Sequence, residues 1–146
     1  MKGKEKFKLL IPGIVVGFIL GSILTALVGV NTEDAIPNYI GGAMCCLIPT
    51  LLNTVIVLKT GSKAVNRNLS VGSAFLRAIP FAIGAGILGF LIVFGLIENV
   101  IQISTCDISL GVTIAYQATL GVLVSTLLAL VALNKYLSDV KYTKRK

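Results

Sequence analysis

The chain has 146 residues, of which 55% are hydrophobic and 13% are charged, and its formal net charge is +7. Ordinary soluble domains are about 45–50% apolar and about 25% charged. The apolar residues here form four long blocks without a polar face, whereas a helix at the surface of a soluble protein needs one. These features exclude a soluble enzyme, a nucleic-acid-binding domain and a disordered tail. They predict an all-α integral membrane protein with a single membrane domain, residues 1–146.

Each of the four apolar blocks is long enough to cross a bilayer as a helix. Crossing about 30 Å of hydrocarbon takes roughly 20 mostly apolar residues, and backbone groups in lipid must find partners within their own segment. None of the blocks contains a charged residue. We therefore predict a bundle of four transmembrane helices over residues 9–30, 39–58, 78–97 and 108–133.

Charged residues are divided unevenly among the segments that flank these spans. All 13 Lys and Arg residues lie in 1–8, 59–77 and 134–146, and none lies in 31–38 or 98–107. Short segments rich in Lys and Arg stay on the cytoplasmic side of a membrane. We therefore predict a multi-pass protein of the cell membrane with both termini and the 59–77 loop cytoplasmic. The segments 31–38 and 98–107 are the predicted outer loops.

The N-terminal segment has a second interpretation, a secretory signal, because Lys-rich residues precede an apolar run. Signal sequences have apolar runs of about 7–15 residues, whereas the uncharged and mostly apolar run 9–30 is longer, at 22 residues. The segment Ala26–Val30 is only an approximate cleavage site. An uncleaved first span is the prediction that we favour.

Two segments that lie 68 residues apart share part of their sequence. An Ile-Pro pair at 11–12 matches 79–80, and Ile-Leu-Gly at 19–21 matches 87–89. If this match reflects an internal repeat, the bundle consists of two tandem two-helix hairpins in parallel, as in some transporters. The alternative is that both helices need Pro near one end and Gly for packing.

The predicted spans offer little chemistry. They contain no Asp, Glu, Lys, Arg or His, and the whole chain has no His. Proton relays and ion-coupled transporters usually need an ionisable group at membrane depth, and metal sites need clustered ligands. We therefore expect no catalytic residue, no metal and no cofactor. The three cysteines are interpreted as packing residues that form no disulfide: Cys45 and Cys46 in the second span and Cys106 in the second outer loop.

Two amide side chains inside the spans, Asn53 and Gln117, are the main candidates for a binding site. An amide has two donors and two acceptor sites, and it needs partners in lipid. Pro49 lacks a backbone N–H and so frees the carbonyl oxygen one turn before it. One hypothesis is a polar pocket formed by Asn53, Thr54, Tyr116 and Gln117. The alternative, which we favour, is a hydrogen bond between helices with no ligand.

Small residues recur at every fourth position on three of the predicted helices. Such stripes let helix backbones approach closely in lipid, where the hydrophobic effect does not drive helices together. We expect two of the stripes to pack inside the bundle and the third to face another copy or another protein. The stripes are Gly13, Gly17 and Gly21 on the first span, Ala78, Ala82 and Gly86 on the third, and Gly121, Ser125 and Ala129 on the fourth.

Two functions are consistent with these features. The first is a non-catalytic membrane component (a small subunit, scaffold or immunity-type protein) that acts through helix contacts with other membrane subunits or with itself. The alternative is a small oligomeric transporter or pore for a solute or lipid, which the repeat and the two amides favour. An enzyme is the weakest hypothesis. The lipid bilayer is the expected partner of the basic flanks, so the net charge of +7 needs no nucleic acid.

Overall fold

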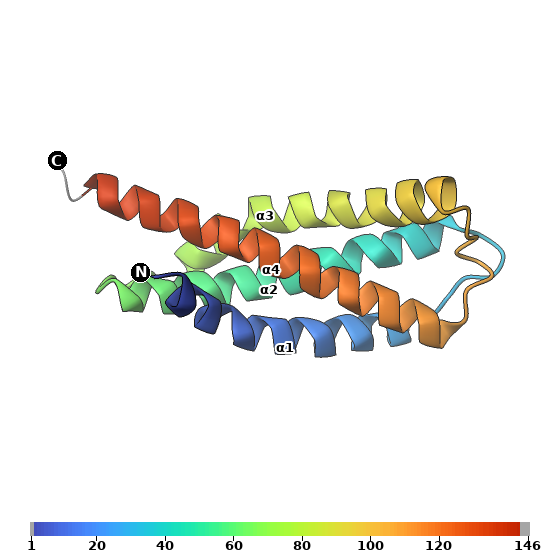
Figure 1. Cartoon of the computed structure of the whole chain (residues 1–146), viewed down its shortest axis with the longest axis horizontal. Helices are drawn as coiled ribbons and strands as arrows, with labels where there is room; N and C mark the ends of the chain where they lie inside the picture. Colours follow the sequence, from blue (N-terminus) through green and yellow to red (C-terminus); the bar gives the residue numbers. More distant parts are fainter. Residues whose placement is uncertain (1, 144–146) are drawn as a thin grey trace.

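The computed structural model describes residues 2–143 as an all-helical bundle (Figure 1). Each of the four helical segments is long and apolar enough to cross a membrane, which confirms the prediction of four such helices. Within residues 2–143 there is no β-strand. The last three residues of the predicted cytoplasmic end, 144–146, lie outside the described part. The elements are α1 (Gly3–Val28), α2 (Ile36–Ala64), α3 (Val71–Leu91), which continues as the π-helix η1 (Ile92–Val100), and α4 (Leu110–Thr143).

Helix α2 lies at the centre of the bundle and packs against each of the other helices. Helices α1 and α3 lie on opposite sides and have no contact with each other. Helix α4 crosses the bundle obliquely, from the side of α3 at its C-terminal end to the side of α1 at its start (Figure 1). The outer helices therefore present most of their surface to the surroundings. In an apolar stretch of 18 residues, 22% of α1 is buried, whereas the corresponding share of α2 is 50%.

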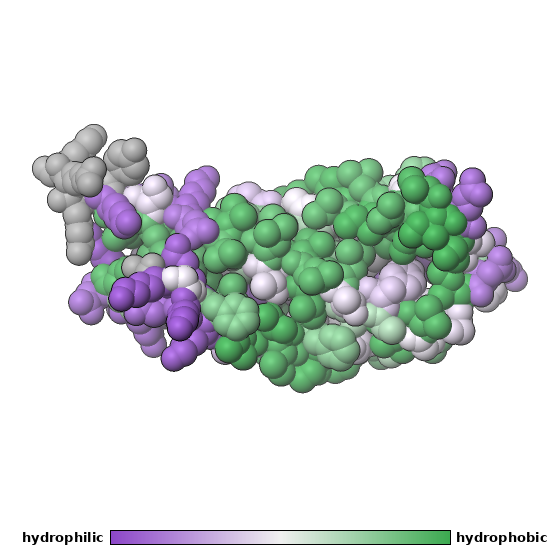
Figure 2. Space-filling model, in the orientation of Figure 1, coloured by the Kyte–Doolittle hydropathy of each residue, from purple (hydrophilic) through white to green (hydrophobic). Residues whose placement is uncertain are grey.

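The surface residues change in character along the length of the bundle, from hydrophilic at each end to apolar between them. Figure 2 shows one face of the molecule, with an apolar band across its middle and a dense group of hydrophilic residues at the end where α1 begins and α4 ends. A smaller hydrophilic group covers the opposite end, which holds the connections between α1 and α2 and between η1 and α4. This band is what a protein surrounded by hydrocarbon requires.

The helices extend beyond the predicted spans. Helix α2 continues to Ala64, and α3 begins at Val71, so the connection between them is residues 65–70 rather than the whole of 59–77. Lys59 lies on this extension and donates a hydrogen bond of 2.5 Å to the carbonyl oxygen of Leu69. The reason for the difference is that a helix can continue into polar residues, whereas hydropathy detects only its apolar part.

Side chains at the starts of α3 and α2 satisfy backbone groups. Ser70 caps α3, because its hydroxyl accepts a hydrogen bond of 3.1 Å from the Ser73 N–H. Asn38 does not cap α2, because the helix begins at Ile36 and Asn38 lies inside its first turn. Its amide instead holds the preceding connection, because it accepts from the N–H of Asn31 at 2.9 Å and donates to the Asn31 carbonyl at 2.8 Å.

The small-residue stripe of α1 is buried against two other helices. Gly13, Gly17 and Gly21 are all buried. A Cβ added at Gly21 would lie 3.3 Å from the Cα of Ala118 on α4, so these two backbones are nearly in contact. The stripe thus brings α1 close to the central helices without a hydrophobic driving force between them.

The stripes of α3 and α4 are buried as well. Ala78, Ala82 and Gly86 face inward on α3, where a Cβ at Gly86 would lie 3.1 Å from Leu47 Cδ1 of α2. All three stripes pack inside the bundle, so none of them is left to face another copy, contrary to the expectation. The buried residues of the third stripe are Gly121, Ser125 and Ala129.

The two halves of the chain use their matching glycines in a related way. Gly21 packs against Ala118 of α4, and a Cβ at its counterpart Gly89 would lie 2.7 Å from the Gly42 carbonyl oxygen of α2. Both outer helices thus place a glycine against a central helix from the other hairpin. The internal repeat itself stays a prediction.

Candidate functional site

A group of polar side chains lies where α1, α2 and α4 meet, towards the end of the bundle that holds the connections between α1 and α2 and between η1 and α4. We call it the Gln117 cluster, and it consists of the buried Thr25, Cys45 and Gln117 and the partly buried Tyr116. The hydroxyl of Thr25 lies 3.1 Å from Gln117 Oε1 and 2.9 Å from the carbonyl oxygen of Gly21. A hydroxyl has one proton and can donate to only one of these acceptors at a time.

The remaining contacts of the Gln117 cluster involve a thiol and a phenol. The thiol of Cys45 lies 3.5 Å from Gln117 Oε1 and 3.1 Å from the Thr25 hydroxyl. Gln117 Nε2 donates to the hydroxyl oxygen of Tyr116 at 3.4 Å. Each side of the Gln117 amide therefore has a partner, which is how a buried amide between membrane helices is expected to be stabilised.

A second polar group lies further along α2 and is not satisfied in this way. We call it the Asn53 group, and it consists of Thr50, Asn53 and Thr54, all at most 1% exposed. Neither amide atom of Asn53 has a hydrogen-bond partner, and neither hydroxyl of the two threonines has one. An unpaired buried polar group typically costs about 1–3 kcal/mol.

The structure divides the predicted pocket between these two places. Tyr116 and Gln117 belong to the Gln117 cluster, whereas Asn53 and Thr54 belong to the Asn53 group. Cys45, which marks the cluster on α2, precedes Asn53 by eight residues, and this separation corresponds to about 12 Å along a helix. The two amides form no hydrogen bond with each other within residues 2–143.

The carbonyl oxygen released by Pro49 has a specific neighbour. Because Pro49 lacks an N–H, the carbonyl of Cys45, four residues earlier, loses its helical donor. Gly121 of α4 packs directly against this carbonyl, since a Cβ at Gly121 would overlap the Cys45 oxygen and lie 3.3 Å from the Cys45 carbonyl carbon. Helix α2 continues through Pro49, and the carbonyl that Pro49 leaves without its helical donor lies at a close contact between α2 and α4.

A carboxylate at the start of the predicted outer loop 98–107 belongs to the helical structure instead. Glu98 lies in η1 and accepts hydrogen bonds from the Thr105 N–H at 2.9 Å and the Thr105 hydroxyl at 2.6 Å. The hydroxyl of Tyr39 on α2 donates to its other oxygen. A π-helix within a longer helix is often found at functional sites, and here it positions Glu98 over the start of α2.

Aromatic rings support this arrangement from the side. The ring of Tyr39 packs edge-on against Phe90 and Phe94, with centroid distances of 5.8 Å and 5.3 Å. Such pairs contribute about 0.5–1.5 kcal/mol each beyond the area they bury. The contact between Glu98 and Tyr39 could not be predicted from the sequence. The sequence shows only that an acidic residue directly follows an apolar block, and this position does not identify the residue that it contacts.

No group of three metal-ligating side chains converges among the residues that the structure describes. A comparison of the chain with known protein families, curated proteins and solved structures finds no match. The candidate site is therefore defined by its geometry alone: a satisfied Gln117 cluster, an unsatisfied Asn53 group, and the Glu98 contact at the end of the bundle.

Proposed function

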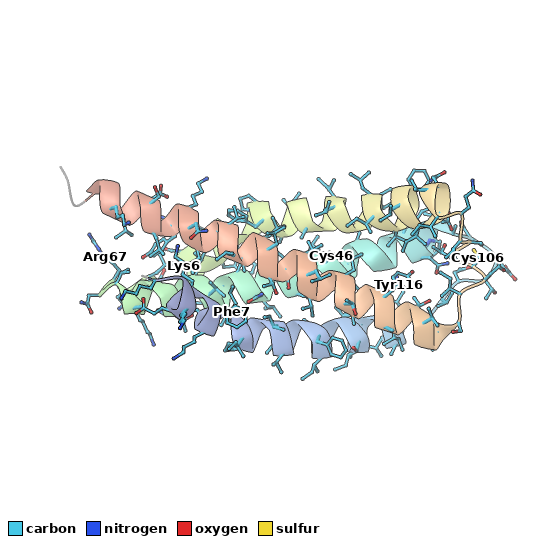
Figure 3. All side chains as sticks on the ribbon, in the orientation of Figure 1. Lys6, Phe7, Cys46, Arg67, Cys106 and Tyr116 are labelled. Carbon is cyan, nitrogen blue, oxygen red and sulfur yellow. The ribbon has the colours of Figure 1, made fainter. Side chains whose placement is uncertain are left out.

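We propose that the chain lies in the cell membrane with both termini and the α2–α3 connection on the cytoplasmic side. The basic residues support this orientation. Lys6 and Arg67 lie at one end of the bundle and Cys106 lies at the other (Figure 3). The two connections beside Cys106, residues 29–35 and 101–109, contain no Lys or Arg, as expected of segments that are translocated.

Cysteine labelling tests this orientation. Cys106 is partly exposed, whereas Cys45 and Cys46 are 1% and 0% exposed. In intact cells, we expect a membrane-impermeant maleimide to label one thiol per chain, and a Cys106→Ala variant to lose the label. Labelling of Cys106 only after the cells are permeabilised would reverse the orientation.

We propose further that the protein is a non-catalytic component of a membrane complex (a subunit, scaffold or immunity-type protein) and that it acts by helix association. The observation that best supports this function is the closed core. Gly89 and Gly121 bring backbone atoms of neighbouring helices into contact, at the Gly42 and Cys45 carbonyl oxygens. Close packing of this kind favours a fixed bundle over one that opens a passage.

The outer face of α3 is the proposed contact surface for another membrane helix. Gly84 has no atom from elsewhere in the bundle within 4 Å of its added Cβ, and the same holds for Gly95 on η1. Large apolar side chains surround them, including Ile83, Ile87 and Leu91, each about half exposed. A small residue that faces away from its own bundle allows a partner helix to approach closely.

Replacing Gly84 by Leu tests this surface. After gentle extraction, we expect the wild-type chain of 15.4 kDa to elute in a larger particle. Gly84→Leu should release the single chain, because the added side chain keeps a partner helix at a distance. Gly111→Leu is the matched control, since Gly111 also has no neighbour within 4 Å, and it should leave the particle intact. A wild-type particle that contains only one chain would contradict the proposal.

A second candidate function is transport of a small polar solute, and the unpaired Asn53 amide favours it. Buried polar atoms without partners are normally satisfied by water or a ligand. In proteoliposomes, transport predicts an efflux of glycerol that Asn53→Leu abolishes. The association function predicts no efflux from either protein and an intact particle for Asn53→Leu.

A further inference from the structure

A groove of about 260 Å³ opens between α3 and α4 at the basic end of the bundle. Pockets for small molecules usually measure about 300–1,000 Å³, so this groove has room for a compact group rather than for a whole lipid. Its floor, the buried or partly buried part of the lining, includes Leu58, Phe81 and Tyr136. Its rim, the exposed part, consists of the charged residues Arg77, Lys135 and Asp139.

The side chain of Arg77 is held in place by Tyr136 and Asp139, but its N–H groups form no hydrogen bond with either residue. Its guanidinium carbon lies 5.6 Å from the centre of the Tyr136 ring, in a cation–π arrangement. Its Nη1 lies 3.9 Å from Asp139 Oδ2, which is an ion pair but is too long for a hydrogen bond. Within residues 2–143 the guanidinium forms no hydrogen bond, so its five N–H donors are available to a ligand in the groove.

Lys135 adds a second positive charge to the same rim. Its side chain is exposed, and within residues 2–143 it forms no hydrogen bond or ion pair. Two cations and one carboxylate give the rim a net positive charge. An Arg with a planar donor set and a nearby Lys are the usual recognition elements for a phosphate group.

The groove lies at the depth of lipid headgroups. Arg77 immediately precedes the apolar block 78–97, and Lys135 follows the last residue of the block 108–133 by two positions. The apolar floor therefore faces the upper part of the acyl chains, and the cations face the phosphate layer. Basic pockets between transmembrane helices at this depth bind anionic lipid headgroups.

We propose that this groove binds the phosphodiester headgroup of an anionic phospholipid, with Arg77 and Lys135 contacting its phosphate oxygens and Phe81 contacting its glycerol and upper acyl chain. The site rests on the proposed membrane orientation but not on the proposed helix association, because it lies near the start of α3, whereas Gly84 lies further along that helix. It also differs from general attraction to an anionic surface, since it depends on two particular cations.

The test measures lipid binding to the purified full-length chain in neutral detergent, by native mass spectrometry and by thermal stability. We expect phosphatidylglycerol to bind and stabilise the chain, and phosphatidylcholine and inorganic phosphate not to do so. Arg77→Gln and Lys135→Gln should each weaken phosphatidylglycerol binding about fivefold, and the double variant about 25-fold. Stabilisation by inorganic phosphate alone would overturn the assignment to a lipid.

Two further variants distinguish binding in the groove from an effect of the overall charge and from a loss of folding. Lys4→Gln with Lys63→Gln removes the same charge from exposed positions outside the groove, and it should change binding less than twofold. Asp139→Asn removes the acidic residue from the rim and should strengthen phosphatidylglycerol binding. Equal losses in the Arg77/Lys135 and Lys4/Lys63 double variants, or no gain with Asp139→Asn, would overturn the proposal.

Discussion

Gly121→Ala is expected to destabilise the bundle by about 3 kcal/mol, at the upper end of the range for overpacked cores. The added methyl group would overlap the carbonyl oxygen of Cys45 and lie 3.3 Å from its carbonyl carbon. These are backbone atoms of the central helix, so they cannot rotate away as a side chain can. Helices α2 and α4 would have to separate along the contact that closes the core.

Thermal unfolding in detergent, followed by circular dichroism, measures this effect. Gly111→Ala is the matched control, because Gly111 lies on the same helix and has no neighbour within 4 Å. It should unfold within about 1 kcal/mol of the wild type, since Ala also favours the helical backbone. Equal stability of the Gly121→Ala and Gly111→Ala variants would show that the backbones of α2 and α4 are not in contact at Cys45.

The number of helices long and apolar enough to cross a membrane was predictable from the sequence, because hydrophobic length is a local property. The ends of the helices were not, as α2 shows: it continues six residues beyond the predicted end at Leu58. Hydropathy reports where an apolar stretch ends, whereas the helical backbone hydrogen bonds continue into the polar residues that follow it. The π-helix η1 was not predictable either, because its nine residues are as apolar as the helix before it.

The candidate site illustrates the same limit for tertiary contacts. That Asn53 and Gln117 are buried and polar follows from their positions in apolar blocks, but their partners depend on how the helices are aligned along the bundle. Gln117 meets Thr25 of α1, which is 92 residues away in the sequence. Likewise, Glu98 meets Tyr39 across 59 residues. A single sequence contains no direct signal for pairs at such distances.

Gly13→Ala should destabilise the bundle by about 1–3 kcal/mol, and Asn53→Ala should remove most of that loss. A Cβ at Gly13 would overlap Asn53 Oδ1 and lie 2.8 Å from Nδ2. The Asn53 side chain is 1% exposed and has little room to move. Replacing it with Ala removes the overlap together with an amide that has no hydrogen-bond partner.

A double-mutant cycle of Gly13→Ala and Asn53→Ala measures this contact, again by thermal unfolding in detergent. We expect the double variant to be more stable than the sum of the single losses predicts, with a coupling energy within the 0.5–3 kcal/mol that touching residues show. Gly17→Ala is the control, because its Cβ would make ordinary contacts, at 3.5 Å from Ser125 Oγ and 3.7 Å from Pro49 Cβ. Paired with Asn53→Ala, it should give a coupling energy near zero. Additive losses in the Gly13–Asn53 cycle would mean that α1 and α2 do not contact each other at Gly13 and Asn53.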